Sequence, residues 1–213
     1  MATASLPLVL ASGSPRRVTL LAELGVPFQT VVSDAPENID PRLDPESQAV
    51  EIAEQKARTV ASQLAAGIVL GADTIVVLDG TLLGKPVDAA DATSMLHRLS
   101  GREHLVVTGI VVVDAESGLL RASAVTSVVG FRALTESEIA QYVASGEPSG
   151  KAGAYAIQGL GAGLISNLEG CFSNVVGLPI CETARLSTTA GITGGSSRPS
   201  CRLPAGVPCP HSV

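Results

Sequence analysis

The feature that most constrains the fold is an apolar stretch at residues 68–78, IVLGADTIVVL, which is rich in β-branched side chains. Such a run is typical of a strand and predicts one central strand with Asp73 near its middle. A carboxylate in an apolar strand is costly to bury unless it is paired, so a chance placement is disfavoured. Asp73 could hold a metal ion or accept a proton from an attacking water. The structural alternative is an Asp bonded to a nearby backbone turn.

Strand and helix signals alternate along the rest of the chain. Ser14 is placed to cap a helix with Pro15 in its first position, and Asp88 is placed to cap another. Thr135 and Glu138 have the spacing of a capping box. We expect further strands at 7–11, 27–33, 104–114 and 119–132, and helices at 45–66, 89–99, 135–143 and 179–187. Interleaved elements with a long hairpin predict an α/β protein with a mixed sheet.

Two segments lack this regularity. Residues 146–165 are rich in Gly and are predicted to line a cleft. Residues 188–213 consist largely of Gly, Ser, Thr and Pro with little periodicity, which predicts a disordered tail. We therefore expect one folded domain at 1–187, followed by a tail at 188–213.

Composition limits the classes of partner. The formal net charge of −6 argues against a nucleic-acid partner and against an anionic membrane surface. No apolar run approaches the roughly 18 residues of a membrane span, and no secretion signal precedes the first strand, so we expect a cytoplasmic protein. A small polyanionic substrate is compatible with this charge, because local clusters of Arg and Lys can reverse the average field.

The sharpest local motif is Ser12-Gly13-Ser14-Pro15-Arg16-Arg17, between the first strand and the first helix. A helix N-terminus offers free N–H groups and partial positive charge, which suit phosphate. Arg16 and Arg17 add guanidinium groups that match phosphate oxygens in a bidentate fork. The alternative is an N-cap serine followed by two solvated arginines.

Other charged residues carry weak signals by themselves. Gly80-x-x-x-Gly84-Lys85 is one residue short of a P-loop, and Pro86 stands where that motif needs Ser or Thr. Lys85 could touch a phosphate, but a lone Lys after a turn is more often solvated. Glu37 and Lys56, taken alone, are interpreted as surface charges. The residues alone therefore indicate a phosphate-handling α/β protein.

The chain resembles the Maf family of nucleotide pyrophosphatases over roughly residues 6–187. The motifs that carry the resemblance occur in order along the chain. They are LASGSPRR (10–17), EQKAR (54–58), LGADTIVVLDG (70–80), GKP (84–86), LSGREH and VVTG (99–109), GEPSGKAGAYAIQGLGAGLI (146–165) and NVVGLPICET (174–183).

This resemblance implies a two-lobed α/β fold around a deep cleft, similar to that of the inosine triphosphate pyrophosphatases. It also implies hydrolysis of the bond between the α- and β-phosphates of a nucleoside triphosphate with a divalent cation such as Mg or Mn, and it implies a homodimer. The implied roles fall into two groups. Substrate binding would involve Ser14, Arg16, Arg17 and Lys85, with Lys56 offsetting charge. Metal binding or activation of the water would involve Glu37 and Asp73, with Asp73 the favoured base.

The resemblance also bears on the choice of base. Thr74 and Gln158 look like the branch of the family that acts on dTTP and UTP, and a Gln amide offers a donor and an acceptor to a pyrimidine edge. One alternative is the same chemistry on a modified purine such as 7-methyl-GTP. Another is a nucleotide-binding regulator of septum formation without turnover. Gly150 departs from the family pattern, which commonly has an acidic residue there.

Overall fold

The computed structural model describes residues 7–192, and residues 1–6 and 193–213 lie outside the described part. Within that part, seven strands form one mixed sheet in the order β2-β1-β3-β5-β6-β7, with β4 also paired to β3. The strands are β1 (Leu8–Leu10), β2 (Phe28–Thr30), β3 (Ile68–Leu78), β4 (Thr81–Leu83), β5 (Glu103–Asp114), β6 (Leu120–Phe131) and β7 (Ile165–Glu169). β1 is parallel to β2 and β3, and the other pairs are antiparallel. The predicted mixed α/β fold is confirmed.

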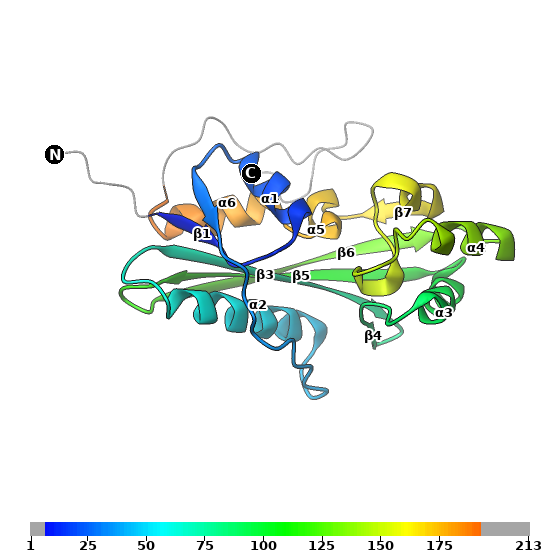
Figure 1. Cartoon of the computed structure of the whole chain (residues 1–213), viewed down its shortest axis with the longest axis horizontal. Coiled ribbons are helices and arrows are strands. Elements are labelled where there is room, and N and C mark those ends of the chain that lie inside the picture. Colours follow the sequence, from blue (N-terminus) through cyan, green and yellow to red (C-terminus); the bar gives the residue numbers. More distant parts are fainter. Residues whose placement is uncertain (1–6, 193–213) are drawn as a thin grey trace.

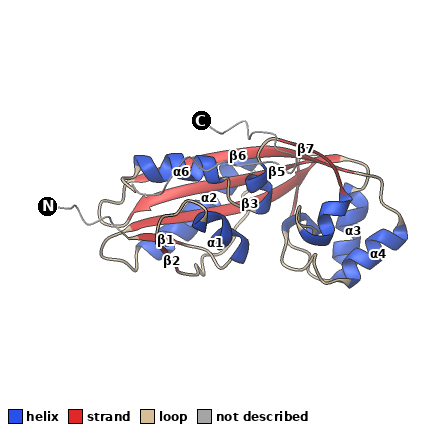
Figure 2. Ribbon diagram, turned by 90° about the horizontal axis from the view of Figure 1, so that it is seen from above, coloured by secondary structure: helices blue, strands red, loops and turns tan. Residues whose placement is uncertain are grey.

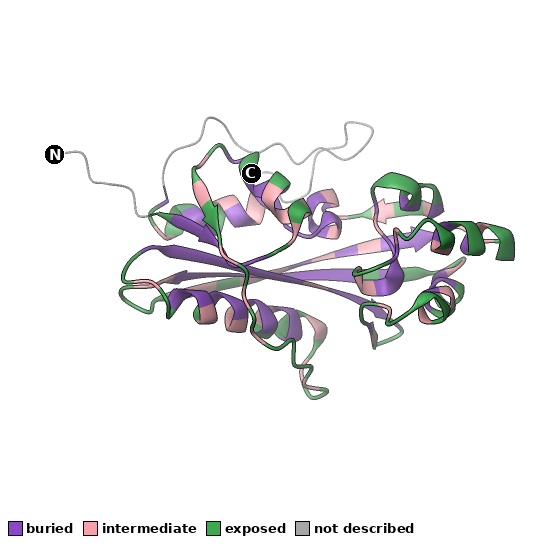
Figure 3. Cartoon of the chain, viewed as in Figure 1, coloured by how far each residue is buried: buried purple, intermediate pink, exposed green. Residues whose placement is uncertain are grey.

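Helices cover both faces of this sheet (Figure 1). On one face lies α2 (Pro45–Ala61), and on the other lie α1 (Pro15–Ala22), α5 (Phe172–Val176) and α6 (Ile180–Thr189). The pair α3 (Ala89–Leu99) and α4 (Glu136–Ala144) packs together at one end of the sheet (Figure 2). Burial follows these layers, because the strands are mostly buried and the outward sides of the helices are exposed (Figure 3). The implied division into two lobes stays a prediction.

Local capping sets where several helices begin. The Ser14 side chain accepts a hydrogen bond from the Arg17 N–H at the start of α1, and Asp88 accepts one from Asp91 at the start of α3. The predicted capping box of Thr135 with the first turn of α4 is also present. These side chains satisfy N–H groups that have no partner inside the helix, so the predicted starts are confirmed.

The prediction for the segment 45–66 was wrong at its end. The helix α2 stops at Ala61, and the Ser62 N–H bonds back to the carbonyl of Arg58. The chain then turns into β3 through Gly67, whose φ of +138° is open to glycine and strained for other residues. The turn into the sheet therefore overrides the Ala-rich helical signal of residues 62–66.

Three short elements were missed by sequence reasoning, namely β4, β7 and α5. A usable signal existed for β4, because Asp79 and Gly80 between β3 and β4 both have positive φ, at 49° and 75°. Asp-Gly is a common sequence in two-residue hairpin turns with this geometry. For β7 and α5, each five residues long, periodicity is too short to identify.

The helix α2 lies unusually close to the sheet. A Cβ at Gly71 would come within 2.2 Å of the Ala53 carbonyl oxygen, and one at Gly109 within 2.3 Å of the Ala49 carbonyl. Glycines on β3 and β5 thus face small residues on α2, so the two backbones can approach. This contact fixes where the side chains of α2 lie relative to β3.

The last helix, α6, ends at Thr189, two residues beyond the range expected for it. Most of the predicted tail at 188–213 lies outside the described residues. Among residues 7–192, no helix combines the length and the apolar character required to cross a bilayer.

Candidate active site

A pocket lies at a gap in one edge of β3. Along that edge β1 pairs with residues 68–70 and β4 with residues 76–78, while β5 pairs along the opposite edge through residues 68–77. In the described chain, residues 71–75 therefore have no strand beside them on the gap side. A cavity of about 430 Å³ occupies this position. Because side chains alternate across a strand, Asp73 faces α2 and Thr74 faces α1, so both faces of β3 contribute to the pocket.

All nine residues singled out in the sequence lie in the lining of this pocket, although they come from segments far apart in the chain. They are Ser14, Arg16, Arg17, Glu37, Lys56, Asp73, Thr74, Lys85 and Gln158. The Gly-rich segment also reaches the pocket, through residues 150–158. The chemical roles of these residues stay predictions.

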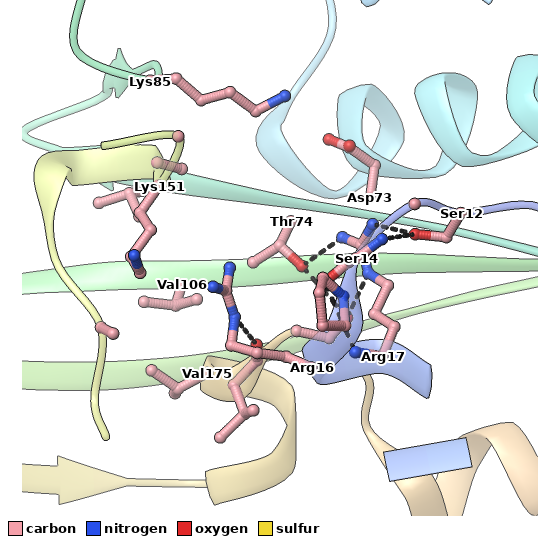
Figure 4. A pocket seen from close by; sticks show the side chains of 18 of the residues that line it. Ser12, Ser14, Arg16, Arg17, Asp73, Thr74, Lys85, Val106, Lys151 and Val175 are labelled. Carbon is pink, nitrogen blue, oxygen red and sulfur yellow. Dashed lines mark hydrogen bonds between the residues drawn. The ribbon is translucent and has the colours of Figure 1, made fainter. Parts of the chain in front are cut away.

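The first group is built on the N-terminus of α1 (Figure 4). The Arg17 guanidinium donates from Nε to the Gly177 carbonyl at 2.8 Å and from Nη2 to the Thr74 hydroxyl at 3.0 Å. Burial lowers the pKa of Arg17, and the nearby charge of Asp73 opposes that shift. Arg16 donates from Nε to the Val176 carbonyl at 3.3 Å, so α5 holds both arginines against the pocket.

Thr74 is in turn held by a second threonine, Thr108. Its hydroxyl lies 2.9 Å from the hydroxyl of Thr108, which is completely buried and donates to the Asn174 carbonyl at 3.2 Å. The two threonines on β3 and β5 thus connect the Arg17 guanidinium to the backbone of α5. A buried chain of hydrogen bonds of this kind fixes the orientation of the group at its end.

The second group gathers on the α2 side of β3. Lys56 Nζ donates to Asp73 Oδ1 at 2.6 Å and to Glu37 Oε1 at 2.8 Å, and Lys85 Nζ donates to Glu37 Oε2 at 2.7 Å. Lys56 and Asp73 are only 8% and 7% exposed. Desolvation raises the pKa of Glu37, but its bonds to Lys56 and Lys85 outweigh that effect and bring the pKa to about 2. Glu37 is therefore ionised at neutral pH.

Lys151 is a pocket residue that sequence reasoning did not single out. It begins the run Lys151-Ala152-Gly153, and its ammonium group donates to the main-chain carbonyl of Glu147. Burial and the charge of Arg16 lower the pKa of Lys151, while the Glu147 carboxylate opposes the shift. Two cations that face one cavity repel each other, which favours an anion between them. In the sequence, Lys151 stood inside the quoted motif at 146–165, directly after Gly150, with no separate signal of its own.

Tyr155 supports the segment that leads to Gln158. Its hydroxyl lies 2.6 Å from His104 Nε2, and its ring packs edge-on against Phe131 and His104. Burial lowers the pKa of His104 to about 4, so this imidazole is neutral at physiological pH. The hydrogen bond between His104 and Tyr155 thus holds the residues before Gln158 against the core.

The pocket differs in charge from the chain as a whole. Its lining contains five cationic side chains and two carboxylates, whereas the chain has a formal net charge of −6. The three lysines of the chain, at positions 56, 85 and 151, all lie in this lining. A positive cavity in an acidic protein concentrates a small polyanion at one place.

The donor set also bears on metal binding. No group of three or more His, Cys, Asp or Glu side chains that could hold an ion occurs within residues 7–192. Asp73 and Glu37 do converge, because both contact the ammonium group of Lys56. Mg²⁺ commonly binds through one or two carboxylates together with substrate phosphates and waters. These two carboxylates therefore fit an ion that arrives with a phosphorylated ligand.

The chain is similar to known proteins along most of its length. The family model described as "Maf-like protein" matches residues 7–190. A protein of Syntrophotalea carbinolica named dTTP/UTP pyrophosphatase is 50% identical over 198 residues, covering 91% of this chain and 90% of its own length. Proteins of the same name from Geobacter sulfurreducens and Pelotomaculum thermopropionicum are 50% and 47% identical, covering 82% and 83% of this chain and 92% and 93% of their own lengths. The family match spans most of the chain, and the chain belongs to the family of Maf-like proteins.

Proposed function

We propose that this protein is a nucleoside triphosphate pyrophosphatase that hydrolyses dTTP and UTP to the monophosphate and pyrophosphate. The observation that carries the proposal is the convergence of five cations and two carboxylates on one cavity of an acidic chain. The relatives named dTTP/UTP pyrophosphatase, 47–50% identical, support the choice of substrate.

The cations would position the triphosphate. Arg16 and Arg17 lie at the N-terminus of α1, where backbone N–H groups also favour phosphate. Lys85 and Lys151 approach the cavity from other segments of the chain. Hydrolysis of a phosphoanhydride depends mainly on positioning and on neutralisation of charge, so a cavity lined by several cations is suited to it.

Asp73 would act as the general base. Its Oδ1 is bonded to Lys56 at 2.6 Å, which leaves Oδ2 to accept a proton from water. The water oxygen bonds to one phosphorus of the α–β anhydride, its proton passes to Asp73, and the P–O bond of the bridging oxygen breaks. The products are a nucleoside monophosphate and pyrophosphate. Lys56 holds both Asp73 and Glu37 in place beside the cavity.

A divalent cation such as Mg²⁺ or Mn²⁺ is part of this proposal. Asp73 and Glu37 would hold it together with phosphate oxygens of the substrate. When bound, such an ion neutralises charge on the triphosphate and polarises its phosphoryl oxygens. Glu37 is ionised at neutral pH, as a metal ligand must be.

Recognition of the base would rest on Gln158, with Thr74 acting through Arg17. Gln158 is exposed in the pocket lining, and its amide can donate and accept at a pyrimidine edge. The Thr74 hydroxyl is bonded to Arg17 and Thr108, so its contribution lies in holding the arginine. A cytoplasmic location and a homodimer complete the proposal and stay predictions.

The first test is a product assay on the purified chain. It offers dTTP, UTP, CTP, ITP and 7-methyl-GTP with Mg²⁺ or Mn²⁺ and separates monophosphate, diphosphate, pyrophosphate and phosphate. We expect pyrophosphate with dTMP or UMP. Turnover of 7-methyl-GTP alone would show that the substrate carries a modified purine and not a pyrimidine. Folded protein that turns over none of them would favour a nucleotide-binding regulator.

Asp73→Asn separates catalysis from binding. We expect kcat for dTTP to fall at least about 100-fold, because the amide cannot take the proton, while nucleotide binding persists. The matched control is Asp79→Asn, since Asp79 lies in the turn after β3 and its positive φ of 49° suits Asn. Asp79 is paired with Arg102 and lies outside the pocket lining. Equal kcat in Asp73→Asn and the control would show that Asp73 is not the general base.

A further inference from the structure

The Glu147 carboxylate binds the Gly-rich segment that carries Gln158. Its Oε1 accepts hydrogen bonds from the Tyr142 hydroxyl at 2.9 Å and the Gly161 N–H at 2.9 Å, and its Oε2 accepts one from the Leu160 N–H at 3.0 Å. The Tyr142 hydroxyl in turn accepts a bond from the Ala156 N–H at 3.2 Å. One carboxylate and one phenol thus bind three backbone N–H groups of residues 156–161.

The segment is wrapped closely around these two groups. A Cβ at Gly161 would lie 2.2 Å from the Ala156 carbonyl oxygen and 2.7 Å from the Tyr142 hydroxyl. A Cβ at Gly159 would lie 2.7 Å from Glu147 Oε2, and its φ of +70° is also disfavoured for other residues. Only glycine fits at both places, so the sequence of the segment is adapted to this contact.

The anchoring points lie on either side of Gln158 in the chain. Ala156 is bonded on one side, and Leu160 and Gly161 are bonded on the other. The Gln158 side chain makes no hydrogen bond within residues 7–192, so the anchored backbone on either side is what limits where the amide can lie. Glu147 is absent from the pocket lining, so it can influence a ligand only indirectly, through this segment and through its charge near Lys151.

The Glu147 carboxylate is well suited to this task in its ionised form. Burial raises its pKa, but the N–H groups of Gly161 and Leu160, the Tyr142 hydroxyl and the charge of Lys151 outweigh that effect and lower it. All three hydrogen-bond partners of the carboxylate, one hydroxyl and two backbone N–H groups, act as donors to it. An amide of the same shape would place its own N–H₂ against one of these donors and lose at least one bond.

We infer that Glu147, together with Tyr142, is a positioning residue that fixes Gln158 for recognition of the nucleotide base. This inference rests on the proposed pyrophosphatase function. The backbone position limits the region that a side chain can reach, so fixing the backbone on both sides restricts where the amide lies, and small displacements of a binding group weaken a complex strongly. Glu147 thereby determines affinity for the substrate while leaving the phosphate chemistry to other residues.

The first arm of the test needs no substrate. Hydrogen exchange of the amides at 156–161 is measured by mass spectrometry in the wild-type chain and in Glu147→Gln, Tyr142→Phe and Glu169→Gln. Both variants at the anchor should exchange faster in this segment, and Glu169→Gln, a matched change on β7, should not. Unchanged exchange in Glu147→Gln and Tyr142→Phe would overturn the anchoring role.

The second arm uses steady-state kinetics with dTTP. Glu147→Gln should raise KM about fivefold, the effect of losing one polar contact, with kcat changed less than about twofold. In a Gln158→Ala background the same change should raise KM no further, because the group that it positions is gone. Additive effects in this double-mutant cycle, or a fall in kcat alone, would overturn the inference. A wild-type chain without dTTP turnover would instead refute the proposed function.

Discussion

Lys56 is the residue on which the carboxylate side of the pocket depends. It is only 8% exposed, and its ammonium group contacts both Asp73 and Glu37. Two carboxylates near one another repel, and a cation between them offsets that repulsion. The low pKa of Glu37, about 2, is maintained by Lys56 and Lys85 against the desolvation that would raise it.

Lys56→Met should therefore alter the pH dependence of activity. The pKa of Glu37 should rise, so the acidic limb of the profile of kcat/KM against pH should move to higher pH. At neutral pH we expect kcat/KM to fall at least about tenfold, because the carboxylates lose their shared cation.

The matched control for this change is Arg58→Met on the same helix. Arg58 pairs with Glu54 and is half exposed, so removing it should leave the profile unchanged. If the Lys56→Met profile coincided with that of Arg58→Met, Lys56 would not be the residue that keeps the pKa of Glu37 low.

Single residues also show what could be predicted from local sequence. The prediction that Arg16 and Arg17 bind phosphate followed from their place at the start of a helix, and the structure puts both in the pocket. Glu37, Lys56 and Lys85 looked like surface charges until the family resemblance was considered. These three side chains meet through contacts across 19 and 48 positions of the chain, which no local pattern contains.

At the scale of elements, the packing of α2 on β3 and β5 places Lys56 beside Asp73. Gly71 and Gly109 permit this packing, because a Cβ at either would collide with the backbone of α2. The close separation of α2 from the sheet thus depends on glycine at these two positions.

Gly109→Ala should disturb both stability and activity. The new Cβ would lie 2.3 Å from the Ala49 carbonyl, so α2 must shift. Overpacking of this kind typically costs about 1–3 kcal/mol of unfolding free energy, measured by urea denaturation. Since Lys56 moves with α2, kcat for dTTP should fall as well.

Gly163→Ala provides the comparison, because a Cβ there meets nothing within 4 Å and its φ is not positive. It should leave both the unfolding free energy and kcat near the wild-type values. If Gly109→Ala matched it in both measurements, the close approach of α2 would not matter for the site.

Elements were predictable where side chains determine their ends. Ser14, Asp88 and Thr135 cap helices at the expected positions, and the long hairpin of β5 and β6 agrees within one residue. The strands β4 and β7 were missed because they are short and owe their existence to pairing with β3 and β6. Pairing of that kind is a tertiary effect that overrides weak local propensity.

At the scale of the whole molecule, charge is distributed unevenly. The chain has 20 acidic residues and only 14 Lys and Arg, yet its three lysines all line one pocket. The Lys85 side chain is 54% exposed and the Lys56 side chain is 10% exposed, so the two differ greatly in access to reagents.

Acetylation of the more exposed lysine, Lys85, should therefore be enough to inactivate the protein. We expect a mild amine-specific reagent to modify Lys85 before Lys56, with activity lost as Lys85 reacts, and dTTP to slow that reaction. Site-resolved mass spectrometry alongside the product assay measures both. Full activity after complete acetylation of Lys85 would argue against a role for its charge.

Asp73 and Thr74 are neighbours in the chain, yet they serve opposite sides of β3. Inserting or deleting one residue between 68 and 72 would exchange them, turning the carboxylate toward Arg17 and the hydroxyl toward Lys56. The ten consecutive partners on β5 resist such a slip. The length of this stretch thus matters more than the identity of its apolar side chains. An exchange of Val for Ile would do little harm, whereas the gain or loss of a single residue would disrupt the site.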